Sequence, residues 1–276
     1  MLNQYSRTSL LVGREKLYKL WNKKVIVFGI GGVGGNVIES LARFGIGSFD
    51  LVDDDLVCLT NINRQILATR KTYGKYKVDA AEERIHDINP RIIVNKHLTF
   101  YLPDKKEEFD FSKFDYVIDA LDTVTAKLSI IESAKKANVP VISAMGCGNR
   151  LDPTKLVLCD IYETKGDPLS KVMRHELRKR GIDSLKVVFS TEPPTRPNEK
   201  ETADSCLYHC VCPPNTKRKC TDRRDIPGST SFVPPVAGTL IAYQVAKDLM
   251  ETKDKKENER NDNPFTTDKR PTAHNL

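Results

Sequence analysis

The strongest constraint on the fold is a glycine-rich turn between an apolar run and an amphipathic stretch. The run Val-Ile-Val-Phe at 25–28 is typical of a buried parallel strand, and 33–44 has helical periodicity. Glycine lets the backbone turn sharply and approach a phosphate, and the next helix offers unpaired N–H groups to an anion. We interpret the turn as a nucleotide-phosphate site, although tight helix–sheet packing alone also requires glycines. Its key residues are Gly29, Gly31, Gly32 and Gly34.

Strand and helix patterns alternate through the first half of the chain. After the first strand and helix, we expect strands at 48–52, 92–94, 116–118 and 139–143, and helices at 77–86 and 125–137, with a further helix over 10–21 before them all. This alternation predicts a doubly wound, Rossmann-like, mostly parallel α/β sheet.

The pattern changes in the second half. We expect an antiparallel strand over 156–162, a helix over 168–180, a strand over 185–190, a long functional loop over 191–231 and a helix over 236–250. The division is therefore a core of about 24–150 and a smaller substrate-facing extension of about 151–235, both within one unit of 5–250. The polar residues 251–276 are expected to be a disordered tail.

Length and charge place few limits on function. The 276 residues carry a formal charge of +7, which permits a polyanionic partner without requiring one. No run of 18 apolar residues occurs, and the N-terminal stretch lacks the apolar core of a secretory signal. We expect a cytoplasmic protein with no membrane partner.

Acidic residues follow two of the expected strands. Asp53 ends the second strand, where a ribose-binding carboxylate belongs, and Asp119 and Asp122 follow a later strand. Asp55 either contacts a ligand or caps the following turn, and Asp122 either contacts a ligand or caps the helix after it. Because carboxyl ends of parallel strands meet at one edge, these carboxylates are candidates for a shared site that holds Mg²⁺ beside phosphate oxygens.

Cationic residues extend the same site beyond what a dinucleotide needs. Arg64 follows Asn61, and Lys77 begins a helix. Two cations that face a phosphate-binding turn suit a triphosphate better than a nicotinamide. The alternatives are a surface ion pair for Arg64 and a solvated helix end for Lys77.

At these residues the chain resembles the ubiquitin-activating superfamily, including its bacterial ThiF-type adenylyltransferases. The resemblance implies that Gly32 approaches phosphate, Asp53 holds the ribose and Asp122 binds Mg²⁺, with Arg64, Lys77 and Asp122 as the catalytic residues. The full set of expected nucleotide contacts is the four turn glycines with Asp53, Asp55, Asn61, Arg64, Gln65, Lys77, Asp119 and Asp122. The resemblance also implies a homodimer in which Arg7 or Arg14 reaches the partner's ATP. Thr123 is a departure, because carrier-activating relatives usually have Asn there.

Longer motifs narrow the resemblance. DDDLVCLTNINRQI, DYVIDALDTVTAK and DPLSKVMRHELRKRGI are similar to the tRNA threonylcarbamoyladenosine dehydratases over most of residues 5–250. The resemblance implies that ATP activates the threonyl carboxylate of a modified adenosine in tRNA and that loss of water closes a ring. It also implies a possible sulfur-relay partner, a cysteine desulfurase or its sulfur acceptor.

The second half is basic and rich in cysteine. Residues 165–224 hold 14 Lys and Arg against 8 Asp and Glu. Lys171, Arg174 and Arg178 share one helix face, which fits either tRNA phosphates or a solvated surface. Four cysteines within fifteen residues are read as a zinc site, as sulfur-handling thiols or as incidental, since their spacing is irregular for Zn²⁺. They are Cys206, Cys210, Cys212 and Cys220.

Three rival functions follow from the same residues. Adenylation of a ubiquitin-like sulfur-carrier protein uses the same fold, but the usual C-x₂-C zinc pairs are missing. A non-enzymatic, nucleotide-dependent RNA-binding or scaffold protein would bind ATP without turning it over. NAD-dependent reduction is disfavoured by Arg64 and Lys77.

Overall fold

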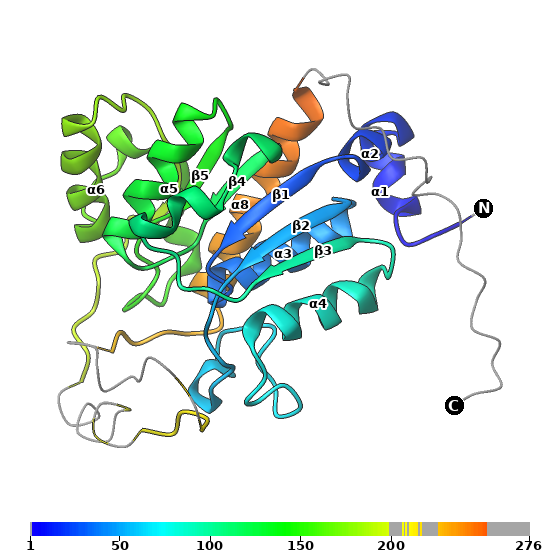
Figure 1. Cartoon of the computed structure of the whole chain (residues 1–276). Coiled ribbons are helices and arrows are strands. Elements are labelled where there is room, and N and C mark those ends of the chain that lie inside the picture. Colours follow the sequence, from blue (N-terminus) through cyan, green and yellow to red (C-terminus); the bar gives the residue numbers. More distant parts are fainter. Residues whose placement is uncertain are drawn as a thin grey trace.

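The computed structural model has one seven-stranded sheet at its centre (Figure 1). It describes residues 2–198, 206, 208, 210–214, 216 and 226–252. The strand order is β3-β2-β1-β4-β5-β7-β6, and all neighbours are parallel except β6 and β7. The predicted doubly wound, mostly parallel fold is confirmed. The strands are β1 (Lys24–Phe28), β2 (Ser48–Val52), β3 (Ile93–His97), β4 (Tyr116–Asp119), β5 (Val141–Ala144), β6 (Leu156–Asp160) and β7 (Lys186–Ser190).

Helices cover both faces of the sheet, as its alternating side chains require. Val25 and Val27 of β1 lie in one buried cluster with residues of α2, α3, α4 and α8, whereas Ile26 and Phe28 lie in the other with residues of α5 and α6. Figure 1 shows α5 and α6 on the side opposite α3. The helices are α1 (Ser6–Val12), α2 (Arg14–Trp21), α3 (Gly32–Phe44), α4 (Lys77–Ile88), α5 (Val124–Lys136), α6 (Pro168–Lys179) and α8 (Val233–Glu251).

Two expectations about helices need correction. The single helix expected over 10–21 is two helices, because Gly13 has φ +87° and interrupts the chain between α1 and α2. The last helix begins at Val233, before the predicted position 236, because Pro234 and Pro235 stand in its first turn, where proline is tolerated.

The expected extension continues the central sheet. β7 pairs in parallel with β5, and β6 pairs antiparallel with β7, so residues of the extension share the sheet of the core. No helix in the described ranges has both the length and the apolarity needed to cross a membrane. Beyond Thr252, the tail expected from the sequence lies outside the described residues.

The packing of α8 on α3 places the last helix beside the glycine turn. Gly238 allows this approach, because a Cβ there would lie 2.4 Å from the Val33 carbonyl oxygen and 2.8 Å from the Asn36 Cβ. A Cβ on Gly32 would lie 3.0 Å from the Cβ of Pro234, at the start of α8. The short distance between these helices therefore holds the start of α8 against the start of α3.

We expect Gly238→Ala to lower the free energy of unfolding. Overpacking against a backbone oxygen costs about 1–3 kcal/mol, whereas the better helix propensity of alanine returns at most about 1 kcal/mol. Chemical denaturation measures the difference. The control is Thr239→Ala, at an exposed position of the same helix, which should change stability by no more than about 0.5 kcal/mol. Equal stability of the two variants would contradict close α3–α8 packing.

Candidate active site

A cavity of about 590 Å³ opens at the carboxyl ends of the central strands. Its size is within the usual range for a small-molecule ligand. One part is lined by the glycine turn and the residues after β2, and the other by residues after β5 and at the start of α6. The expected site residues on its walls are Gly29, Gly31, Gly32, Asp53, Asp55, Asn61, Arg64, Gln65, Lys77 and Asp122.

Two positions of the glycine turn, Gly29 and Gly34, have no room for a side chain. Gly29 has φ +87°, and a Cβ there would lie 2.8 Å from the Ala120 carbonyl oxygen. A Cβ at Gly34 would lie 1.9 Å from the Gly29 carbonyl oxygen. Gly34 does not line the cavity, so its requirement is close packing of α3 on the turn. Gly31 and Gly32 form the cavity wall where α3 begins, with its first N–H groups available to an anion.

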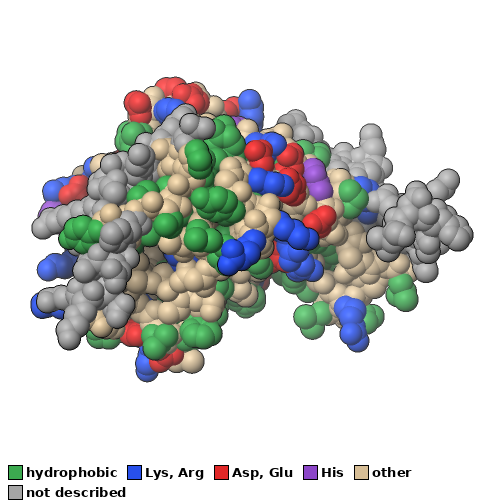
Figure 2. All heavy atoms as spheres, turned by 90° about the horizontal axis from the view of Figure 1, so that it is seen from below, with side chains coloured by type: hydrophobic (Ala, Val, Ile, Leu, Met, Phe, Trp, Pro, Cys, Tyr) green, Lys and Arg blue, Asp and Glu red, His purple; other side chains and the backbone are tan. Residues whose placement is uncertain are grey.

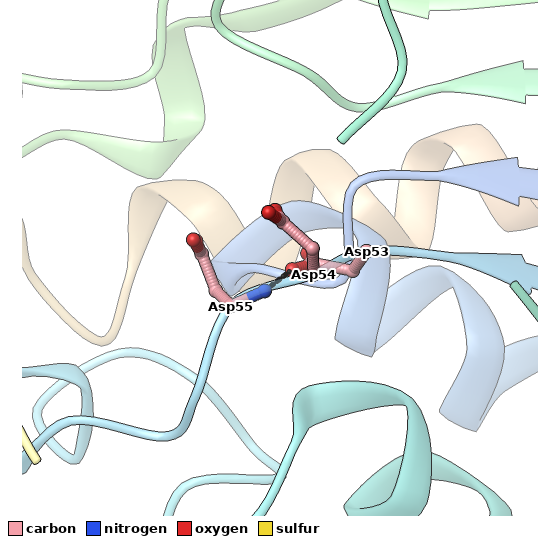
Figure 3. A group of neighbouring side chains, drawn as sticks. All are labelled: Asp53, Asp54 and Asp55. Carbon is pink, nitrogen blue, oxygen red and sulfur yellow. Dashed lines mark hydrogen bonds between the residues drawn. The ribbon is translucent and has the colours of Figure 1, made fainter. Parts of the chain in front are cut away.

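Asp53 ties the glycine turn to the segment after β2. One carboxylate oxygen accepts a hydrogen bond from the Ile30 N–H at 2.7 Å, and the other accepts one from the Asp55 N–H at 2.8 Å. Figure 3 shows this second bond, with the Asp54 and Asp55 carboxylates directed to the same side. Burial raises the pKa of the Asp53 carboxyl, and the nearby Lys77 ammonium acts against that rise.

Lys77 is a buried cation at the start of α4. Its Nζ atom lies 2.7 Å from an Asp55 carboxylate oxygen and 3.8 Å from one of Asp53. Its side chain is only 8% exposed, so the alternative of a solvated helix end is wrong. Because Asp53, Asp55 and Lys77 all line the cavity, the ammonium is held where a phosphate could replace a carboxylate as its partner.

The segment from Asn61 to Gln65 lies over the glycine turn. The Asn61 side chain accepts the Cys58 N–H at 3.1 Å, and this closes a short 3₁₀ turn. Arg64 donates to the Thr60 carbonyl at 2.9 Å and lies beside Gly32. Gln65 is buried beside Gly31. These local bonds fix the backbone that carries the Arg64 guanidinium to the cavity.

The two aspartates after β4 have different positions. Asp122 is exposed and lines the cavity. The N-cap of α5 is Thr123, so the alternative of Asp122 as the helix cap is wrong. Asp119 has no exposed side-chain surface, is bound by Lys127 and Ser143, and does not line the cavity. The structure therefore does not bring Asp119 to the nucleotide contacts that the sequence predicted.

The carboxylates on the cavity wall form a suitable donor set for Mg²⁺. Within the part of the chain that is described, Asp53, Asp54 and Asp55 are the one group of three or more side chains whose ligand atoms lie together. Asp122 lines the same cavity. Hard oxygen donors beside a phosphate-binding turn are what Mg²⁺ prefers.

The expected zinc ligands do not gather in the described residues. Cys206, Cys210 and Cys212 form no such group of ligand atoms there, and Cys220 lies outside the described residues. Cys206 and Cys212 do line the cavity, and the Cys58 Sγ atom lies 3.6 Å from the Val211 carbonyl oxygen. This stretch therefore contributes to the cavity wall, and a zinc site stays a prediction.

Two residues of the second half organise the cavity and escaped the sequence analysis. Arg150 is buried, donates to Asp167 at 2.6 Å and to the Gly146 carbonyl at 2.5 Å, and so links the end of β5 to the start of α6. Asn149, at φ +60°, exchanges two 2.7 Å hydrogen bonds with Gly228. Neither residue belongs to a recognisable motif, so no local signal identifies them.

The basic face of α6 is partly used within the protein. Arg174 donates to the Thr164 carbonyl at 2.9 Å, and the Arg178 guanidinium lies 5.0 Å from the Tyr162 ring centre. Lys171 is exposed. Figure 2 shows the molecule from below, and on that face Lys and Arg side chains alternate with acidic and apolar ones. Further cations belong to the loop expected over 191–231. Of these, Arg196 is exposed, and the following lie outside the described residues: Lys217, Arg218, Lys219, Arg223 and Arg224.

Known proteins share this architecture over nearly the whole chain. The family model described as the ThiF family matches residues 5–273. A tRNA threonylcarbamoyladenosine dehydratase of Bacillus subtilis is 41% identical, over 91% of this chain and 96% of its own. One of Escherichia coli is 36% identical, over 90% and 93%. A crystal structure of the Escherichia coli dehydratase with ATP, 30% identical, has a TM-score of 0.75 and covers 90% of this chain and 93% of its own. The resemblance seen in the sequence is confirmed: the chain belongs to the ThiF family and, within it, to the tRNA threonylcarbamoyladenosine dehydratases.

Proposed function

We propose that this protein uses ATP to dehydrate threonylcarbamoyladenosine in tRNA by adenylating its carboxylate. The observation that carries the proposal is a single cavity in which the glycine turn, Arg64, Lys77 and Asp122 face a second wall built by β5 and α6. Its relatives bear the name of this activity, and one of them has been crystallised with ATP and with AMP.

The first step is attack of the carboxylate on the α-phosphorus. A carboxylate oxygen forms the new bond, and the bond from the α-phosphorus to the bridging oxygen breaks, so pyrophosphate leaves. The glycine turn and the start of α3 orient the phosphates, and Arg64 and Lys77 balance the developing negative charge. Asp122 and the carboxylates after β2 would hold Mg²⁺, which supplies further charge neutralisation on the phosphate oxygens.

The second step is ring closure within the activated group. An oxygen or nitrogen of the threonylcarbamoyl group attacks the acyl carbon and loses its proton, and AMP leaves with one oxygen of the former carboxylate. The net change is loss of one water. No protein nucleophile is needed, and Cys147 on the cavity wall is unsuited to be one, because burial raises the pKa of its thiol to about 11.

The proposal also includes the expected assembly, location and partners of the protein. We expect a homodimer in the cytoplasm, and tRNA contacts through exposed cations such as Lys171. A sulfur-acceptor partner and zinc on the cysteine segment rest on the sequence alone. Adenylation of a ubiquitin-like carrier is the alternative, and an assay of tRNA dehydration distinguishes the two activities.

Lys77→Met should weaken ATP binding at least about 10-fold, which corresponds to about 1.4 kcal/mol. The variant removes the cation and leaves Asp53 and Asp55 facing the phosphates. Titration with a fluorescent ATP analogue measures the affinity. Lys75→Met is the matched control, because Lys75 is an exposed lysine two residues away that pairs with Glu83. Equal affinities for the two variants would refute the role of Lys77.

Purified protein with ATP, Mg²⁺ and tRNA bearing threonylcarbamoyladenosine should yield a nucleoside lighter by one water in mass spectrometry. Asp122→Ala should slow this conversion by at least about 10²-fold, a loss of the size seen when one charge-stabilising group is removed. Asp104→Ala, at an exposed position away from the cavity wall, should leave it unchanged. An unaltered nucleoside together with AMP transfer to a ubiquitin-like carrier would favour the alternative. Full activity of Asp122→Ala would refute the site assignment.

A further inference from the structure

A buried ion pair lies directly under the turn that carries Asp122. The Lys127 Nζ atom is 2.9 Å from an Asp119 carboxylate oxygen, and neither side chain has any exposed surface. Desolvating two charges costs several kcal/mol per ion, so such a pair is a weak source of stability. Its presence under the turn that carries Asp122 therefore suggests a role other than stability.

The two side chains of the pair hydrogen-bond to the backbone N–H and the carbonyl of Leu121. The Asp119 carboxylate accepts the Leu121 N–H at 3.1 Å, and the Leu121 carbonyl accepts a hydrogen bond from Lys127 at 3.0 Å. Ser143 of β5 donates to the same carboxylate at 2.5 Å. Donor and acceptor of one peptide residue are thus both held by buried charges, and the next residue in the chain is Asp122.

The same turn touches the glycine turn. The Ala120 N–H donates to the Phe28 carbonyl at 2.8 Å, at the end of β1. A Cβ on Gly29 would lie 2.8 Å from the Ala120 carbonyl oxygen and 3.0 Å from a Leu121 methyl carbon. Movement of residues 120–121 would therefore change the distance between Asp122 and the phosphate-binding turn.

We propose that Lys127 is a positioning residue for this reaction: its buried ammonium, with Asp119, holds residues 120–121 so that Asp122 faces the phosphates at a fixed place. The proposal rests on the proposed function and adds a residue that does not line the cavity. A carboxylate displaced by about 1 Å can cost about 10²-fold in rate. The effect should appear in the Mg²⁺-dependent part of nucleotide binding, since that is where Asp122 acts.

The test variant is Asp119→Asn with Lys127→Met, which removes both charges and leaves an amide oxygen for the Leu121 N–H. ATP affinity is measured without tRNA, with and without Mg²⁺, beside the dehydration rate. We expect little change in Mg²⁺-free affinity, a loss of at least about 5-fold in the gain that Mg²⁺ confers, and a rate lower by about 10–100-fold. Lys136→Met, an exposed lysine on the same helix, is the control and should match the unaltered protein.

Coupling to Asp122 separates positioning from general damage. In an Asp122→Ala background the double substitution should cause no further loss of the Mg²⁺ effect, because residues that act as a unit are not additive. Should the double variant fail to fold, Ser143→Ala, which keeps both charges, should show a smaller loss in the same direction. An unchanged Mg²⁺ effect in whichever variant folds, or full additivity with Asp122→Ala, would overturn the proposal. If the wild-type protein had no dehydratase activity, the proposed function would fail. The role of Lys127 would still be tested, because nucleotide affinity is measured independently of the dehydration rate.

Discussion

The contact between the glycine turn after β1 and the turn after β4 is the constraint on which the site depends. β1 and β4 are neighbours in the sheet, but α3 follows β1 on one face and α5 follows β4 on the other. Their connections therefore diverge, and a crevice opens between them. Gly29 meets Ala120 at the bottom of this crevice, where no side chain fits. The absence of a Cβ at that point lets the glycine turn and the Asp122 carboxylate share one cavity.

Charge is handled differently at the two levels of the crevice. At the floor, Asp119 and Lys127 neutralise each other without exposure, and their hydrogen bonds go to backbone and Ser143. At the wall, Lys77 is paired with Asp55 at 2.7 Å, but both line the cavity. The charges at the wall are therefore open to the cavity, whereas those at the floor are enclosed. In the proposed mechanism, the charges at the floor position the turn after β4, and the charges at the wall bind the nucleotide.

Much of the fold could be predicted, because hydrophobic period and turn chemistry are local signals. The strand–turn–helix at 25–44 forms as predicted, and the charged candidates Asp53, Asp55, Arg64 and Lys77 line one cavity, whereas Gly34 does not. The prediction that Asp119 contacts the nucleotide is wrong, because an acidic residue at a strand end gives the same sequence signal whether it faces a ligand or a buried lysine. The partner of Asp119 is Lys127, and the partner of Asn149 is Gly228, far along the chain. Such pairings depend on the three-dimensional arrangement and leave no trace in spacing or composition.

Two anchors after β5 hold the second wall of the cavity in place. Arg150 joins the end of β5 to Asp167, and Asp167 in turn caps α6 through Ser170. The Asn149 side-chain oxygen accepts the Gly228 N–H, and the Asn149 carbonyl accepts the Thr195 N–H. Both anchors stand within one short stretch after β5, so the two walls of the cavity are assembled at the same edge of the sheet. Under the proposed function, a change of substrate would need new residues on that second wall, while the turn after β4 and its buried charges could stay as they are.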